Sequence, residues 1–352
     1  MPASTRSNLL MPAEWELHAA TWVAWPHNAK DWPGKFEPVP WVYAEIVRNL
    51  ARSEAVEIIV NDGDSQRGIR SILDRANSLG SNVHFHRWPT DRVWTRDSGC
   101  IFVQNSQARR NRLSAVTWRF NAWAKYSNYR RDMHIGKLMA ESMDVPAVEP
   151  MFVNKRVVLE GGSIDVNGRG TLLTTEECLL SKVQQRNPGM KKKDYEAVFA
   201  EYLGVSNVIW LGKGITGDDT HGHVDDLARF VAPNRVVTVV EPNRKDKNHT
   251  PLKENLRRLN SASDQDGRHL EVVELPMPSP IYFEKTRLPA SYANFYIANR
   301  SVLVPVFNDA NDRIALNTLA ECFPDREIVP IYCGDLVWGF GTLHCLTQQQ
   351  PT

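Results

Sequence analysis

Val302-Leu303-Val304-Pro305-Val306-Phe307 is a continuous apolar run with the length and composition of a buried strand. A second run of this kind follows about twenty residues later, Ile328-Val329-Pro330-Ile331-Tyr332. Between the two runs lies an apolar stripe with helical spacing, which consists of Leu316, Leu319, Ala320 and Phe323 and is stopped by Pro324. A strand, a helix and a second strand in this order predict a mixed α/β unit.

The same two patterns recur along the whole chain. Four further helical stripes begin at Val42, Ile69, Ile135 and Tyr195. The further strand-like runs are Val56–Val60, Val83–Trp88, Ile101–Gln104, Val157–Leu159, Thr171–Thr174, Val208–Leu211, Val236–Val240 and Leu270–Leu275. Strand-like runs outnumber helical stripes by about two to one, which favours a mixed α/β fold over a simple βαβα alternation. Because no Pro/Gly/Ser-rich linker divides the sequence, we expect a single domain over residues 1–352.

Composition excludes some classes of partner. The 352 residues include 42 Lys and Arg against 41 Asp and Glu, so the formal net charge is +1 and no global field attracts nucleic acid or an acidic membrane surface. The first ten residues lack the apolar core of a signal peptide. No run approaches the roughly 18 apolar residues that a membrane span needs. The sequence therefore predicts a cytoplasmic protein without nucleic-acid or membrane partners.

One of the five cysteines stands out by its context. The five are Cys100, Cys178, Cys322, Cys333 and Cys345. Their odd number and the lack of C-x-x-C spacing argue against a disulfide framework or a zinc ribbon. Cys345 lies in Gly-Phe-Gly-Thr-Leu-His-Cys-Leu-Thr-Gln-Gln-Gln-Pro (339–351), between an apolar stretch and a run of hydrogen-bonding side chains. Such a cysteine is either a small buried hydrophobe or a nucleophile.

A second cluster, far upstream, contains the partners that a nucleophilic cysteine needs. The segment Gly-Asp-Asp-Thr-His-Gly-His-Val-Asp-Asp (217–226) holds four acids and two histidines. Cysteine, histidine and carboxylates that are distant in sequence are typical of thiol catalysis, because they meet only in the fold.

The same segment also permits a metal hypothesis. His221, His223 and Asp225 match most of the H-x-H-x-D-H pattern of metallo-β-lactamase-like hydrolases, which bind zinc with such residues. The match is incomplete, because Asp226 stands in place of the final histidine and the motif lies in the second half of the chain. A cation or a cationic substrate would equally account for the acids.

Two further carboxylates follow short motifs. Asp97 comes three residues after Trp94, and Glu160 lies at the end of a strand-like run, just before two glycines. Taken singly, Asp97 fits a turn or cap residue and Glu160 fits an exposed side chain at a glycine bulge. Together with Asp219 and Asp225 they form a negative set in an almost neutral protein, and paired carboxylates bind a planar guanidinium best.

At this point the residues resemble a known family. The matching segments are Met11–Glu16, Trp25–Asn28, Val93–Asp97, Phe120–Trp123, Leu159–Ile164, Leu172–Leu179, Gly217–Phe230, Leu288–Tyr296 and His344–Pro351. In this order they resemble the agmatine deiminases, in the family shared with bacterial peptidylarginine deiminases. Two places depart from the family pattern: Cys100 stands where proline is usual, and Trp338-Gly339-Phe340-Gly341 replaces a glycine-richer run.

The resemblance implies a fold and roles for residues. It implies a pentein fold, a five-bladed α/β propeller of ββαβ modules around a central pocket. It makes Cys345 the nucleophile and His223 the general acid and base, with Asp97 and Asp225 binding the guanidinium. It also implies that Trp94, Glu160 and Asp219 line the substrate pocket.

The implied activity is thiol-dependent hydrolysis of agmatine to N-carbamoylputrescine and ammonia, in putrescine biosynthesis. It needs no metal or cofactor, and a homodimer is compatible with it. Free arginine or peptidylarginine is the alternative substrate, although an acidic pocket without a carboxylate-binding arginine suits agmatine better. Three different functions stay open beside it: a zinc hydrolase using His221, His223 and Asp225, a non-catalytic guanidinium-binding protein, and an amidinotransferase.

Overall fold

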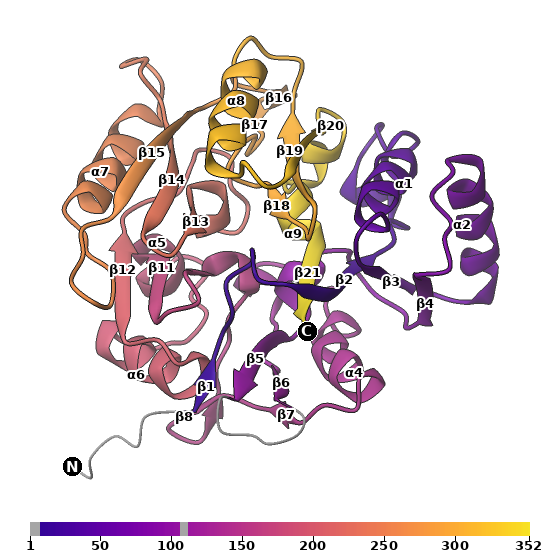
Figure 1. The fold of residues 1–352 in the computed structure, drawn as a ribbon, viewed down its shortest axis with the longest axis horizontal. Helices are drawn as coiled ribbons and strands as arrows, with labels where there is room; N and C mark the ends of the chain where they lie inside the picture. Colours follow the sequence, from indigo (N-terminus) through magenta and orange to yellow (C-terminus); the bar gives the residue numbers. More distant parts are fainter. Residues whose placement is uncertain (1–7, 106–111) are drawn as a thin grey trace.

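Small β-sheets with helices packed around them make up residues 8–105 and 112–352, the part of the chain that the computed structural model describes (Figure 1). The mixed α/β class predicted from the sequence is confirmed. No helix in these two segments is both long and apolar enough to cross a membrane.

Three sheets repeat one arrangement, in which an antiparallel pair is extended by a strand parallel to its second member. Their strands are β10 (Asp165–Val166), β11 (Thr171–Thr175) and β12 (Asn207–Leu211); β13 (Ala228–Ala232), β14 (Arg235–Val240) and β15 (Glu271–Pro276); and β18 (Tyr296–Ile297), β19 (Ser301–Val306) and β20 (Glu327–Tyr332). A parallel pair needs a crossover connection. The crossovers contain α5 (Glu176–Leu180) and α6 (Lys192–Leu203), α7 (His249–Asn260), and α8 (Asp312–Cys322).

Two larger sheets contain the same arrangement with an additional strand. One consists of β1 (Leu9–Leu10), β5 (Ile101–Asn105), β6 (Leu113–Val116) and β7 (Ala147–Val148), with α4 (Ile135–Ser142) as its crossover helix. The other consists of β21 (Thr347–Pro351), β2 (His18–Ala24), β3 (Ala55–Val60) and β4 (Val83–Arg87), with α1 (Val39–Leu50) and α2 (Gly63–Arg75). Two hairpins complete the described sheets: β8 (Met151–Phe152) with β9 (Lys155–Arg156), and β16 (Tyr282–Phe283) with β17 (Thr286–Arg287).

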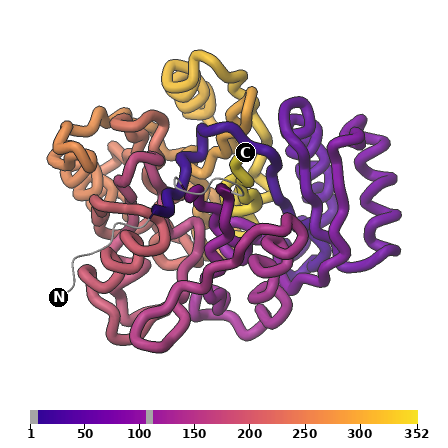
Figure 2. The backbone as a smooth tube through the Cα atoms, turned by 60° about the horizontal axis from the view of Figure 1, so that its bottom comes forward, coloured from indigo at the N-terminus to yellow at the C-terminus, as the bar shows by residue number. Residues whose placement is uncertain are grey.

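Segments from opposite ends of the chain pair in the middle of the molecule. β21 runs antiparallel to β2, and the indole N–H of Trp22 donates to Oε1 of Gln350 at 2.9 Å. Figure 2 shows the early indigo segment lying next to the late yellow segment. Glutamines are unusual in a buried strand, but Gln350 and Gln349 each bind a buried donor, from Trp22 and Arg96. This pairing fixes the position of Cys345, two residues before β21.

Most of the sequence-based elements are confirmed. The five helical stripes lie in α1, α2, α4, α6 and α8, and the strand-like runs overlap β3, β4, β5, β11, β12, β14, β15, β19 and β20. The expected strand Val157–Leu159 is wrong, because the backbone N–H and C=O of Val158 bond to the side chain of Asn187 instead of a full strand partner. Helix α7 was not predicted, since its buried face carries Asn255 between Leu252 and Leu259 and reads as polar.

Candidate active site

Cys345 lies in α9 (Leu343–Leu346), and only 6% of its surface is exposed. The side-chain amide of Asn294 donates to its sulfur at 3.1 Å, and the thiol donates to Oδ2 of Asp225 at 3.6 Å. Burial raises the pKa of the Cys345 thiol well above its ordinary value, and the charges of Asp225 and Asp226 raise it further. The neighbouring carboxylates therefore disfavour the thiolate form of Cys345.

His223 lies in the loop between β12 and β13 and is 1% exposed. Its Nε2 is 3.6 Å from Oε2 of Glu160, and its Nδ1 is 3.9 Å from carboxylate oxygens of Asp97 and Asp225. Burial alone would lower the pKa of His223, but the charge of Asp97 and contacts with Cys178 and Glu160 raise it well above its ordinary value. Neither ring nitrogen has a hydrogen-bond partner among the described residues. The surroundings thus favour the charged form of the imidazole, whose two N–H groups have no fixed acceptor within the described segments.

Asp97 lies in α3 (Thr95–Ser98) and is held from two sides. The indole N–H of Trp123 donates to Oδ2 at 2.8 Å, and the backbone N–H of Gly162 donates to Oδ1 at 3.0 Å. Burial raises the pKa of Asp97 to about 6; the charge of His223 lowers it, and two neighbouring carboxylates raise it. A bound cation would favour the ionised form of this carboxyl group.

Asp225 belongs to a buried network that keeps it ionised. The ring nitrogens of His344 lie 2.7 Å from Oδ2 of Asp225 and 2.9 Å from Oε2 of Glu14. Glu14 in turn pairs with Arg96 at 3.2 Å and Arg229 at 2.9 Å. Burial would raise the pKa of Asp225, but the hydrogen bond and charge of His344 lower it. Oδ1 of Asp225 has no hydrogen-bond partner within the described segments and lies 3.9 Å from Nδ1 of His223.

A pocket of about 280 Å³ reaches Cys345 and Asp97. Aromatic and charged side chains form much of its wall: Lys30, Asp31, Arg92, Trp94, Trp123, Tyr126, Asp219, Phe283, Glu284, Trp338 and Phe340. The predicted pocket residues Trp94 and Asp219 are on this wall, whereas Glu160 is not. Trp338 and Phe340 belong to the segment that departs from the family pattern, so this departure shapes the pocket.

Glu160 is fully buried against a cation of the protein itself. The Nε of Arg186 donates to its two carboxylate oxygens at 3.0 and 3.3 Å, and another guanidinium nitrogen of Arg186 donates to the backbone oxygen of Thr220 at 2.6 Å. Burial would raise the pKa of Glu160, but the charges of Arg186 and His223 lower it. Glu160 thus lies beside the imidazole, and its predicted contact with substrate stays a prediction.

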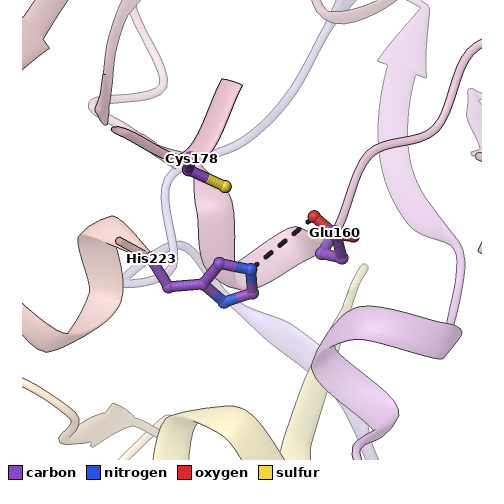
Figure 3. Close-up of side chains that lie close together, drawn as sticks. All are labelled: Glu160, Cys178 and His223. Carbon is purple, nitrogen blue, oxygen red and sulfur yellow. Dashed lines mark ion pairs between the residues drawn. The ribbon is translucent and has the colours of Figure 1, made fainter. Parts of the chain in front are cut away.

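The three residues of the alternative zinc hypothesis, His221, His223 and Asp225, do not form one set of ligands among the described residues. His221 has a backbone φ of +67° and its Nε2 lies 3.1 Å from Oγ of Ser181. Among the described residues, the set of candidate ligands whose atoms lie within 4.8 Å of one another is Glu160, Cys178 and His223, which point toward one another in Figure 3. Since Arg186 already pairs with Glu160 in this set, the geometry does not support the alternative zinc hypothesis.

Gly162 has no side chain, and the space that a Cβ would fill is where His223, Asp225 and Asp97 meet. A Cβ on this residue would lie 2.6 Å from Nδ1 of His223, 2.9 Å from Oδ2 of Asp225 and 3.0 Å from Oδ1 of Asp97. Gly162→Ala is expected to lower kcat/KM by about 10²-fold, because shifts of roughly 1 Å in catalytic groups have effects of this order. Steady-state kinetics would measure the loss. Gly68→Ala in α2, where a Cβ meets nothing within 4 Å, is the control and should keep wild-type kinetics; an unaffected Gly162→Ala variant would contradict the assignment.

The sequence analysis missed Asn294, His344 and Glu14 as parts of the site. Besides its bond to the Cys345 sulfur, Asn294 donates to Oδ1 of Asp226 at 3.0 Å and accepts from the hydroxyl of Thr342 at 2.8 Å. Its side chain therefore ties the segment before Cys345 to the acidic loop. All three residues lie in segments that resemble the family, but their types alone indicate no chemistry.

Comparisons with known proteins agree with this geometry. A family model described as Porphyromonas-type peptidyl-arginine deiminase matches residues 10–351. A protein of Legionella pneumophila (strain Paris), provisionally named an agmatine deiminase, is 36% identical over 345 residues, covering 97% of this chain and 95% of the relative.

Solved structures give the same result. The agmatine deiminase of Enterococcus faecalis is similar with a TM-score of 0.88 and 31% identity, covering 98% of this chain and 96% of that one. A C. jejuni agmatine deiminase with a cysteine-to-serine substitution and bound substrate has a TM-score of 0.85 and 29% identity, with coverage of 98% and 96%. Sequence and structure thus match over nearly the whole length, and the chain belongs to the Porphyromonas-type peptidyl-arginine deiminase family.

Proposed function

We propose that this protein is an agmatine deiminase, which hydrolyses agmatine to N-carbamoylputrescine and ammonia. The observation that carries the proposal is the convergence of four groups: Cys345 and Asp97 line one pocket, and His223 and Asp225 contact them from the protein interior. The names of the Legionella and Enterococcus relatives support agmatine as the substrate.

Substrate binding would use the two carboxylates. A guanidinium has a pKa above ~12 and enters as a cation. Asp97, with a pKa of about 6, and Asp225, with its unpartnered Oδ1, would bind the cation and orient its central carbon toward the Cys345 sulfur. The positive charge that arrives with the substrate would lower the pKa of the thiol, which then gives its proton to solvent in the pocket.

The chemistry would then proceed in two steps. The thiolate forms a C–S bond to the guanidinium carbon, His223 protonates the leaving nitrogen, and the C–N bond breaks to release ammonia. The cysteine now carries a covalent thiouronium. His223, neutral after giving up its proton, takes a proton from water, whose oxygen adds to the same carbon. The C–S bond breaks, leaving a ureido product and the free thiol. The cysteine-to-serine substitution in the substrate-bound C. jejuni structure supports a cysteine nucleophile.

The acids on the pocket wall support a substrate with a second positive charge. Besides Asp97, the carboxylates of Asp219, Asp31 and Glu284 line the pocket. Arg92 also lines it, contrary to the expectation of a pocket without arginine, but it contacts Asp31 at 3.4 Å and lies over the ring of Tyr126. Free arginine and peptidylarginine remain the alternative substrates.

The fold is proposed to be a five-bladed α/β propeller formed by one domain. Five sheets support this proposal, because each contains an antiparallel pair extended by a parallel strand that a helical crossover reaches. Their arrangement around the middle of the molecule in Figure 1 also supports it. The cytoplasmic location and the homodimer stay predictions.

A substrate panel tests the function. Purified protein would be incubated with agmatine, arginine, dimethylarginine and an arginyl peptide, with and without a strong chelator, and ammonia would be measured. Agmatine should give the highest kcat/KM, and the chelator should leave the rate unchanged. A higher kcat/KM for arginine or the peptide would replace agmatine as the substrate, and activity that is lost with chelator and restored by zinc would favour the metallohydrolase.

A further inference from the structure

Asp219, on the pocket wall, is already bound by two side chains of the same short segment. The Lys125 ammonium contacts its Oδ1, and the Tyr126 hydroxyl donates to Oδ2 at 2.6 Å. The Lys125 side chain is 39% exposed, whereas that of Asp219 is 15% exposed. The carboxylate is thus fixed in the wall, and the lysine reaches it from the solvent side.

The segment that carries Lys125 has an unusual backbone. Ala122, Trp123 and Ala124 have φ values of +50°, +58° and +53°, in the left-handed region that non-glycine residues rarely occupy. Tertiary contacts hold this turn in place. The Trp123 indole binds Asp97, and the side-chain amide of Gln184 donates to the backbone oxygens of both Trp123 and Asp219 at 3.1 Å. Lys125 therefore reaches Asp219 from an anchored turn, not from a free loop.

The second positive charge of a dicationic guanidino substrate would lie near the Lys125–Asp219 ion pair. With its guanidinium at Asp97, a distal primary ammonium that turns to Asp219 finds one oxygen occupied by Tyr126 and the other by Lys125. The Lys125 ammonium and the distal ammonium are the same chemical group. Both cannot bind one carboxylate oxygen without mutual repulsion.

We propose that Lys125 is a specificity-determining residue, an internal counter-ion of Asp219 that the distal ammonium of the substrate must displace. This inference rests on the proposed function, because it assumes a guanidino substrate with a second cation. Lys125 thereby weakens the binding of dications but leaves that of guanidines with an uncharged tail unchanged. The preference of the protein for a guanidine with a charged tail over one with an uncharged tail is then smaller than it would be without Lys125.

The test compares two ligands on two lysine variants. Lys125→Met removes the charge but keeps a long apolar side chain. Lys253→Met is the control, because Lys253 is exposed on α7, lies outside the pocket and forms no ion pair with another described residue. Both changes would be made in a Cys345→Ser background, so that calorimetry measures binding without turnover. The ligands are agmatine and pentylguanidine, which has a methyl group in place of the ammonium.

Lys125→Met is expected to tighten agmatine binding by about twofold to fivefold, the range of partly exposed ion pairs. The Kd for pentylguanidine should change less than about twofold on the same scale, and Lys253→Met should not alter the ratio of the two Kd values. Equal shifts for both ligands, an unchanged agmatine Kd, weaker agmatine binding, or no agmatine binding to either protein would overturn the inference.

Two further measurements distinguish the counter-ion role of Lys125 from a carboxylate-binding role and from a failure of the proposed function. If arginine binding falls in Lys125→Met while agmatine binding is unchanged, Lys125 binds a carboxylate and the counter-ion role is wrong. Turnover of agmatine by the wild-type enzyme tests the proposed function separately. A wild-type protein that binds but does not hydrolyse agmatine would defeat the proposed function, and the binding comparison would still decide the role of Lys125.

Discussion

Cys345→Ser is expected to reduce ammonia release below detection while the fold remains intact. Serine lacks the acidity of a thiol, and the acids around the sulfur already raise the pKa of Cys345 well above its ordinary value. An alkoxide would be still harder to form in this negative environment. The activity assay would be combined with circular dichroism and thermal unfolding, which should match the wild type.

Two observations sharpen this prediction. Cys322→Ser is the control, since Cys322 lies at the end of α8, outside the candidate site, and should keep full activity. Mass spectrometry of wild-type protein quenched during turnover should find an amidino-type adduct on the peptide that contains Cys345. Near wild-type activity of Cys345→Ser would show that Cys345 is not the nucleophile.

His223→Ala is expected to lower kcat by roughly 10²–10⁴-fold, the usual contribution of a general acid or base. Substrate binding should survive, because Asp97 and Asp225 remain. The pKa of His223 is raised, so the wild type keeps its protonated acid to a higher pH than an ordinary histidine would, and loses it as the pH rises through that raised pKa. Calorimetry and single-turnover kinetics would separate binding from chemistry.

A neighbouring histidine provides the control for His223→Ala. His221 lies in the same loop, but its ring contacts Ser181 and does not line the pocket. His221→Asn should stay close to wild-type activity, since asparagine tolerates the φ of +67° at this position. If His223→Ala lost binding but kept the rate of the chemical step, the roles assigned to the histidine and the carboxylates would have to be exchanged.

The sequence predicted the mixed α/β class and the groups with distinctive chemistry. Cys345, His223 and Asp225 stood out as candidates because a thiol, imidazoles and carboxylates lie in short polar motifs, but the resemblance to the family supplied their roles. The family resemblance, rather than the motifs, supplied the roles of Trp94, Glu160 and Asp219. The structure places them differently. Trp94 and Asp219 line the pocket, whereas Glu160 is buried outside the pocket wall and pairs with Arg186.

What the sequence did not predict depends on long-range packing. His344 has no ligand-like setting in the sequence, yet its ring bridges Asp225 and Glu14, which are 119 and 330 positions away along the chain. Asn294 reaches Cys345 across 51 positions. Asparagine and a lone histidine are common in ordinary turns and cores, so only the fold distinguishes these two from residues without a role in the site. The left-handed turn at 122–124 is likewise unexpected for Ala and Trp, and tertiary hydrogen bonds compensate for its strain.

During synthesis on a ribosome, β2 emerges long before β21 does. Trp22 and Gln350 are 328 positions apart, which corresponds to roughly 15–65 s of translation. Over that interval β2 can pair with β3, but its other edge stays open to wrong strands of the nascent chain. Cys345 gains its final position only when β21 closes this edge. Slow translation should therefore lower the yield of correctly folded chain, because the Cys345 thiol reaches its position only after β21 has been made.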